Sequence, residues 1–520
     1  MEQEAFAPPP ATGEPREATR TERTLTNWLW MSFGVGAQGV LTVVVLAVLA
    51  RLLTPEQFGQ VSAGLLVIKL SLIFSQGGVS QAVVQHPDLR PEHIRTGNIL
   101  SIAGGTLYFL VLWIGAPYIA AAISTRAITP IVRALSWTLL LQGASRIAEG
   151  LLRRDLRFRT IASIRIASYT IGYALVGIVV AMLGGGVWAL VAAQITQTAL
   201  STVLFIVQRP HDWRPLLDRP AMRELTTFGG GLTLARVGNY AALNGDYFVV
   251  VRWLGTTALG LYERAYQLMA MPATLIGQAL DDVLFPAMAQ IQHDVSRIGT
   301  AYRRVIAAVA IISLPISVVA VLLAPEIVHT VLGHRWSEAI GPFQVLAAGT
   351  LFRSSYKISD SLTRALGAVY ERAWRQWIYA ALVVGGGLLG RPWGITGVSI
   401  GVLFALLINF LLMAQLSIRL LGVHWSDFLV AHAPGIRLTL VVGVPTYLAA
   451  LAMRGALRLP EPAVLLVALA VALVAAGGAL RLDSQRILGQ DGQWLMQRLT
   501  GMFTRRLGVL RPRPAANPET

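Results

Sequence analysis

The run RVIAAVAIISLPISVVAVLLA occupies residues 304–324, and after Arg304 it contains no charged side chain. About 20 apolar residues in a helix cross the hydrocarbon core of a bilayer, so this run predicts a transmembrane helix. Pro315 lies inside the run, but helix-breaking residues are tolerated in membrane spans.

The composition extends this conclusion to the whole chain. Of 520 residues, 54% are hydrophobic and only 13% are charged, whereas about 25% are charged in soluble domains. The mean hydropathy is +0.59. These values exclude a soluble enzyme and a disordered chain. Since the chain has no cysteine, disulfides, iron–sulfur clusters and thiol catalysis are excluded as well.

Further apolar runs predict about 14 spans in total. We place them at residues 28–50, 58–82, 97–121, 129–150, 161–183, 187–207, 226–251, 257–288, 304–324, 338–363, 374–390, 394–418, 434–453 and 462–480. The fold class expected is therefore all-α, a polytopic integral membrane protein.

The distribution of arginine predicts the orientation. The net charge is +16, and on a soluble protein this would suggest a nucleic-acid partner. Here the arginines lie between the apolar runs. The even-numbered turns hold 17 arginines and the odd-numbered turns hold 7. Because cytoplasmic loops are enriched in Lys and Arg, both termini are expected in the cytoplasm. No nucleic-acid partner is expected.

An internal repeat divides the chain. The pattern of Arg51 followed by Phe58-Gly59 recurs at Arg252 and Leu259-Gly260, an offset of 201 residues, and a later leucine pattern recurs at an offset of 211. Six spans separate the copies, so the two halves have the same orientation. The expected domains are an N-terminal tail (1–27), an N-lobe of six spans (28–208), a cytoplasmic linker (209–225), a C-lobe of six spans (226–418), spans 13 and 14 (419–481) and a basic cytoplasmic C-terminal tail (482–520).

Two charged helix faces occupy equivalent positions in the repeats. Both have spacings of 4, 3 and 4, which place four side chains on one face. They consist of Gln142, Arg146, Glu149 and Arg153 in the fourth span, and Arg353, Lys357, Asp360 and Arg364 in the tenth.

Depth decides how these faces are interpreted. Arg153 and Arg364 lie at the membrane boundary, where snorkelling to lipid headgroups explains them as well as ligand binding does. Arg146, Lys357 and the two carboxylates lie deeper, and ionisable groups there normally face a cavity and one another. We predict that the cations bind an anionic headgroup such as pyrophosphate, with Glu149 and Asp360 balancing their charge.

Three further intramembrane charges are candidates. Lys69 in the second span and Arg236 in the seventh are assigned to the same cavity, although an ion pair that only joins helices also fits Lys69. Asp246 lies near the outer end of its span, where either a solvated helix end or a coupling-ion site fits.

Several absences narrow the function. No phosphate-binding loop sequence occurs, so direct use of ATP is not expected. No metal-ligand spacing is found, and no loop is long enough for a catalytic domain. No cofactor is expected, and the sequence leaves open whether H⁺ or Na⁺ is the coupling ion. These features favour a secondary transporter.

The sequence resembles Wzx-type polysaccharide flippases at several motifs. They are 49–59 (LARLLTPEQFG), 77–85 (GGVSQAVVQ), 154–158 (RDLRF), Tyr262 with 264–268 (RAYQL), 284–286 (LFP), and 333–336 (GHRW) before 344–347 (QVLA). The resemblance covers about residues 25–420. That family belongs to a superfamily that also contains multidrug/toxin extrusion antiporters and lipid II flippases.

The resemblance implies two six-helix lobes around a V-shaped cavity. It also implies alternating-access flipping of undecaprenyl-diphosphate-linked oligosaccharides across a bacterial inner membrane, for exopolysaccharide, capsule or O-antigen synthesis. Membrane lipids, and polymerase and chain-length proteins of the same pathway, are the partners implied. A multidrug cation antiporter of the same fold is the first alternative, although cations outnumber anions on both faces. A membrane polysaccharide polymerase or glycosyltransferase is the second.

Overall fold

The computed structural model describes residues 39–76, 78–123, 125–290, 294–482, 487 and 489. The expected N-terminal tail, the start of the first span and nearly all of the C-terminal tail lie outside the described residues. Within this part of the chain the structure is helical and contains no strand. The all-α fold class is confirmed.

The first half of the chain forms one group of helices. After a helix at Gly39–Leu52, it contains α2 (Pro55–Gln76), α3 (Val79–Gln85), α4 (Pro91–Ala122), α5 (Ile128–Arg154), α6 (Phe158–Tyr169), the π-helix η1 (Thr170–Gly177), α7 (Ile178–Met182) and α8 (Val187–Gln208).

The second half forms another group and ends in a helical hairpin. It contains α9 (Arg219–Trp253), α10 (Gly255–Gln290), α11 (Val295–Leu322), α12 (Ala324–Val331), the 3₁₀-helix η2 (His334–Ala339), α13 (Ile340–Ala348), α14 (Thr350–Ala365), α15 (Val369–Gly390), η3 (Arg391–Trp393), α16 (Gly394–Leu421), α17 (Trp425–Val430), α18 (Ala433–Gly455) and α19 (Glu461–Leu482).

Hydropathy distinguishes most of the long helices from three that hold site charges. Eight helical stretches among the described residues are long and apolar enough to cross a membrane, and one of them, Tyr370–Leu421, contains both α15 and α16. The long helices α5, α9 and α10 are not among the eight. These three hold Arg146, Arg236 and Glu263. The chain is a multi-pass membrane protein, and the count of about 14 spans stays a prediction.

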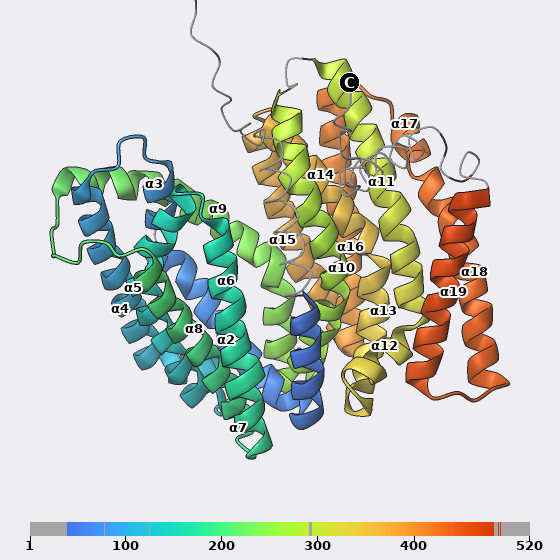
Figure 1. Cartoon of the computed structure of the whole chain (residues 1–520), viewed down its shortest axis with the longest axis horizontal. Coiled ribbons are helices and arrows are strands. Elements are labelled where there is room, and N and C mark those ends of the chain that lie inside the picture. The colour runs from blue at the N-terminus through green and yellow to red at the C-terminus, as the bar shows by residue number, and fades with distance from the viewer. Residues whose placement is uncertain are drawn as a thin grey trace, which may run out of the picture.

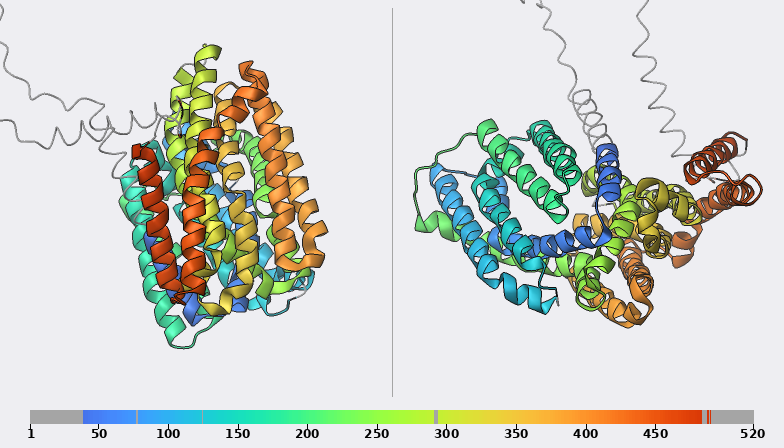
Figure 2. Two further views of the ribbon diagram at one scale, coloured as in Figure 1. Left: turned by 90° about the vertical axis from the view of Figure 1, so that its right-hand side faces the viewer. Right: turned by 90° about the horizontal axis from the view of Figure 1, so that it is seen from below.

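The two groups approach each other at one end and separate toward the other (Figure 1). We call these the converging end and the diverging end. Helix α9 begins beside α3 and α4 at the diverging end and later packs on α10 and α15. The hairpin of α18 and α19 lies at the side of the second group, against α11 and α12 (Figure 2).

Glycines bring the groups into backbone contact at the converging end. A Cβ added to Gly59 of α2 would lie 1.7 Å from the Thr256 carbonyl oxygen, and one added to Gly260 of α10 would lie 1.9 Å from the Pro55 carbonyl oxygen. Only residues without a side chain allow this approach. The two glycines occupy equivalent positions of the internal repeat, so the repeated element is itself the contact between the groups.

Trp336 of η2 closes the same end. Its side chain is fully buried, its indole Nε1–H donates to the Ala50 carbonyl at 3.0 Å, and its ring meets Phe58 edge-on with centroids 5.4 Å apart. Arg51 also donates to the Thr330 carbonyl at 2.9 Å. The converging end is therefore packed tightly, with a buried aromatic side chain at the junction.

Candidate functional site

Glu149 of α5 lies at the centre of three arginines. Its carboxylate is 3.2 Å from Arg146, 2.8 Å from Arg153 and 2.9 Å from Arg165. The glutamate side chain is only 11% exposed. A buried carboxylate needs such partners because its desolvation is costly. The spacings of three and four residues place Arg146 and Arg153 on the same face as Glu149, and Arg165 reaches it from α6.

Arg236 of α9 adds a fourth positive charge to this cluster. It lies within electrostatic range of Arg146 and Arg153, on the other side of the boundary between the groups. Arg146 also donates to the Gln142 side chain at 3.4 Å. This N-lobe cluster (Arg146, Glu149, Arg153, Arg165 and Arg236) therefore contains four guanidinium groups and one carboxylate, so it has an excess of positive charge.

The four charged residues of the tenth predicted span lie on α14, where Asp360 and Arg353 have different surroundings. Asp360 pairs with Arg364 at 3.3 Å and accepts a hydrogen bond from Arg372 of α15. Lys357 is half-buried on the same helix. The cation–anion pairing predicted from the 4-3-4 spacing is thus present for Asp360, with Arg372 as an additional partner.

Arg353 lies deeper, among tyrosines. Its guanidinium carbon is 4.4 Å from the ring centroid of Tyr266, and it donates to the Tyr266 hydroxyl. Its Nε is buried without a hydrogen-bond partner. A cation over an aromatic face is stabilised by the ring quadrupole, so Tyr266 orients Arg353. The Nε–H of Arg353 remains without an acceptor among the described residues.

Asp246 is fully enclosed, with 2% of its surface exposed. The Tyr262 hydroxyl donates to one carboxylate oxygen at 2.7 Å, and the Tyr247 backbone N–H donates to the other at 3.0 Å. Arg353 lies within electrostatic range. The solvated helix end considered for Asp246 does not fit this burial.

Lys69 of α2 is exposed. It lies within electrostatic range of Glu263 of α10, which also pairs with Arg264 at 2.7 Å and accepts a hydrogen bond from Ser62. This charged group therefore joins α2 and α10.

An aromatic pair lies beside these charges. Tyr169 and Tyr173 stack with ring centroids 5.1 Å apart at the start of the π-helix η1, and the Tyr173 hydroxyl donates to Gln194 at 2.8 Å. Tyr173 lies within electrostatic range of Arg264. Stacked rings with hydroxyls give the boundary a surface that is both apolar and hydrogen-bonding.

Four of these charged residues were not among the sequence candidates. Arg165, Glu263 and Arg264 all lie within predicted spans, and an ionisable group at that depth is in itself a functional signal. Arg372 lies just before the eleventh predicted span, where it looked like an ordinary positive-inside loop residue. Its contact with Asp360 depends on the helix packing.

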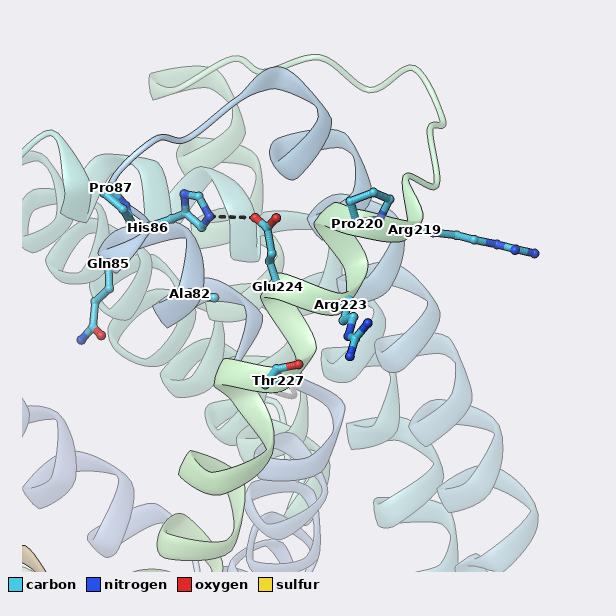
Figure 3. Close-up of a pocket in the computed structure, with 9 residues that line it drawn as sticks. All are labelled: Ala82, Gln85, His86, Pro87, Arg219, Pro220, Arg223, Glu224 and Thr227. Atoms are coloured by element: carbon cyan, nitrogen blue, oxygen red, sulfur yellow. Dashed lines mark hydrogen bonds and ion pairs between the residues drawn. The ribbon is translucent and has the colours of Figure 1, made fainter.

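A cavity of about 970 Å³ opens at the diverging end between α3 and the start of α9. Figure 3 shows the residues that line it: Ala82, Gln85, His86, Pro87, Arg219, Pro220, Arg223, Glu224 and Thr227. Hydrogen bonds from His93 and then His86 hold the pKa of Glu224 below its usual range. The two bonds measure 2.9 and 3.0 Å.

The fold and the charged boundary define a class of protein. The structure resembles the lipid II flippase MurJ in an inward-closed conformation, with a TM-score of 0.68 and 14% identity over 87% of this chain and 99% of that one. It also resembles an inward-facing multidrug resistance MATE family transporter, with a TM-score of 0.61 and 16% identity over 74% and 95%. The molecule is thus a multi-pass membrane protein with a transporter fold.

Sequence comparison identifies the family. A family model described as polysaccharide biosynthesis protein matches residues 48–341, so the chain belongs to that family. It is 23% identical to the lipopolysaccharide biosynthesis protein WzxC of Escherichia coli K12, over 84% of this chain and 89% of the relative. It is 27% identical to the succinoglycan biosynthesis transport protein ExoT of Rhizobium meliloti, over 58% and 60%.

Proposed function

We propose that this protein is a flippase that moves undecaprenyl-diphosphate-linked oligosaccharides from the cytoplasmic to the outer leaflet of a bacterial inner membrane. The observation that carries the proposal is the N-lobe cluster at the boundary between the groups, in which three arginines contact one glutamate and a fourth, Arg236, lies within electrostatic range of Arg146. Membership of the polysaccharide biosynthesis family and the roles stated in the names of WzxC and ExoT support the same substrate class.

The excess cations match a diphosphate. Guanidinium groups form charge-assisted, often bidentate hydrogen bonds to phosphate oxygens. The attraction is stronger where little water screens it. Arg146 and Arg153 are already held by Glu149, so their positions are set before the substrate arrives. The stacked pair of Tyr169 and Tyr173 and the polar boundary would accommodate the sugars, while the polyprenyl chain stays in lipid.

The same arrangement argues against export of organic cations. A cation exporter needs a carboxylate that is free to pair with its substrate. Glu149 faces three arginines and Asp360 faces two. An organic cation entering this boundary would meet net repulsion.

The proposal also assigns the two ends of the molecule to sides of the membrane and names the proteins that would act after this one. The diverging end carries the arginine-rich turns, so we assign it and both termini to the cytoplasm. We treat the protein as a transporter with no enzymatic activity of its own. Polymerase and chain-length proteins of the pathway would act on its product.

Closure of the diverging end should depend on the substrate. When that end shuts, the cations of the two lobes approach, and in a low-dielectric interior their repulsion opposes closure. A bound diphosphate supplies negative charge and removes this penalty. A ligand that binds the closed state more tightly shifts the population toward it.

We propose that Asp246, enclosed by tyrosines, takes up the coupling ion, H⁺ or Na⁺.

The test is polysaccharide export in cells whose own flippase is deleted. We expect Arg146→Gln and Lys357→Gln each to reduce export tenfold or more, because a hydrogen bond to a charged group contributes about 1.5–3 kcal/mol. The same variants should be present in the membrane at wild-type levels.

Arg126→Gln is the control, because Arg126 is exposed on a turn at the converging end. Wild-type export by both Arg146→Gln and Lys357→Gln would contradict the proposed role of the cations. Normal export of lipid-linked substrate by cells that lack the chain altogether would contradict the proposed function itself.

A further inference from the structure

Three potential metal ligands meet at the converging end, and none of them belongs to the charged clusters described above. His329 of α12, His334 of η2 and Glu461 of α19 present ligand atoms that all lie within 4.8 Å of one another. His329 Nδ1 is 2.7 Å from Glu461 Oε1, and His334 Nε2 is 3.6 Å from Glu461 Oε2. The three residues come from separate elements, so the fold brings them together.

The hydrogen bonds around His329 define which nitrogen can bind a cation. Its Nε2 lies 2.9 Å from the Ser337 hydroxyl, and that hydroxyl donates its only hydrogen to the His334 carbonyl at 2.6 Å. Nε2 of His329 must therefore be the donor, and Nδ1 faces the carboxylate. A neutral imidazole has one N–H, so a positive charge, either a proton or a metal ion, is needed between Nδ1 and Glu461.

This arrangement is typical of a metal-binding histidine. Ligating histidines generally donate the second ring N–H to a nearby acceptor, which fixes the tautomer and the ring orientation. Ser337 performs that role for His329. Glu461 is 36% exposed and His334 is 77% exposed, so an ion can enter from the aqueous side.

A second cluster of two histidines and one glutamate lacks the free nitrogen lone pair that a metal ion needs. His86, His93 and Glu224 also lie within 4.8 Å of one another, and Figure 3 shows His86 directed at Glu224. However, His93 Nδ1 accepts the Arg90 backbone N–H at 3.1 Å. Its Nε2 must therefore carry the proton that it donates to Glu224, and no lone pair remains there for a metal.

We propose that His329 Nδ1, His334 Nε2 and the Glu461 carboxylate bind a Zn²⁺-class transition metal ion, with a fourth position open to water. Zinc binds nitrogen and carboxylate ligands at about 2.0–2.2 Å in a tetrahedron, so ligand atoms should lie about 3.3 Å apart. The observed 2.7 and 3.6 Å bracket this value. The ion would replace the proton between His329 and Glu461, and the exposed His334 would move in to complete the site.

Metal binding would fix the segment that closes the converging end. His334 precedes Trp336, whose indole is buried against Ala50 and Phe58, and Glu461 belongs to the terminal hairpin. An ion at this site therefore links the hairpin to the segment that carries the buried tryptophan. The binding site does not depend on the proposed transport function, whereas an effect of metal on export rests on it.

The experiment measures Zn²⁺ binding to the full-length chain, purified in detergent without a polyhistidine tag and stripped with a chelator. Isothermal titration with ZnCl₂ should give one tight site per chain. We expect His334→Ala and Glu461→Gln each to weaken this site at least 100-fold. Ser337→Ala should weaken it about 10–100-fold, the usual effect of losing a residue that orients a ligand.

Two control variants separate this site from other histidines. His86→Ala removes a member of the second cluster, and His424→Ala removes an exposed histidine at the start of α17; both should bind Zn²⁺ with wild-type affinity. Circular dichroism melting checks that each variant is folded. The proposal is overturned if the wild-type chain shows no tight site, or if the folded His334→Ala and Glu461→Gln variants bind Zn²⁺ as tightly as the wild type does.

Discussion

At the scale of a single residue, Glu149 shows why the site carries a net positive charge. One nearly buried carboxylate cannot neutralise three guanidinium groups within 3.2 Å. It does hold Arg146 and Arg153 in fixed directions, and this lowers the conformational entropy that would be lost when an anion binds. The glutamate is therefore best understood as a positioning residue for the cations.

At the diverging end, Glu224 links stability to pH. Its pKa is held below the usual value by hydrogen bonds from His93 and His86. A depressed carboxyl pKa contributes stability above the unfolded pKa, about 4.3, and the contribution is lost as pH falls through the folded pKa. We expect the melting temperature of the wild type to fall more steeply below about pH 5 than that of Glu224→Gln, measured by thermal unfolding in detergent. Parallel pH profiles for the two proteins would contradict this.

The site residues differ in how far sequence could predict them. Arg146, Glu149 and Arg153 follow from helical spacing, because residues three and four apart share a face. Arg165 reaches the same carboxylate from 16 residues away on another helix, and Arg372 reaches Asp360 from α15. Such contacts depend on how helices pack, and spacing along one helix contains no information about that.

At the scale of helices, the crossing of α2 and α10 determines how tightly the converging end closes. Gly59→Val would place a Cβ 1.7 Å from a backbone oxygen, and backbone at a packed crossing cannot yield that far. We expect this variant to hold the converging end open. An Ala50→Cys reporter, at a position only 1% exposed in the wild type, should then react with an impermeant maleimide.

Gly385→Val in α15 is the matched control, since nothing lies within 4 Å of its added Cβ. Its Ala50→Cys reporter should stay protected. Equal labelling of the reporter in the two valine variants would show that the glycine crossing does not determine closure.

A bidentate ion pair is among the contacts that hold the terminal hairpin to the second group. Arg454 of α18 contacts both carboxylate oxygens of Glu326 of α12 at 2.7 Å, and the Glu326 side chain is only 4% exposed. Arg454→Ala leaves this carboxylate without its cation, so we expect a loss of about 1–3 kcal/mol in unfolding free energy. Thermal unfolding measures it, with the exposed Arg458→Ala as control. Equal melting of the two variants would contradict this role.

Hydropathy predicted the helices far better than their interruptions. The run at residues 304–324 overlaps α11 up to Leu322, although α11 already begins at Val295, and residues 394–418 lie within α16. The predicted span at 338–363 is divided at Gly349 between α13 and α14, and the span at 161–183 contains the π-helix η1. Apolar content indicates burial in lipid but does not indicate a local change in the backbone hydrogen-bonding pattern. The apolar runs therefore could not predict the break at Gly349 or the π-helix η1.

At the scale of the whole molecule, two helix groups meet at one end and are joined by α9, whose Arg236 reaches the N-lobe cluster. The repeat predicted from sequence places its equivalent glycines at this junction. In the proposed alternating-access cycle, the structure, with the converging end packed and the diverging end apart, would be one of the states. The account predicts a second state in which the diverging end closes around the bound diphosphate headgroup of the substrate.

The most direct test measures the distance between the groups at the diverging end. Phe158 at the start of α6 and Tyr370 at the start of α15 are exposed, and the chain contains no native cysteine. Spin labels on Phe158→Cys and Tyr370→Cys, in nanodiscs, would report the distance by pulsed electron paramagnetic resonance. We predict that an undecaprenyl-diphosphate-linked oligosaccharide shifts the distribution to shorter distances, and that Arg146→Gln abolishes the shift. An identical distribution with and without this substrate would contradict the account.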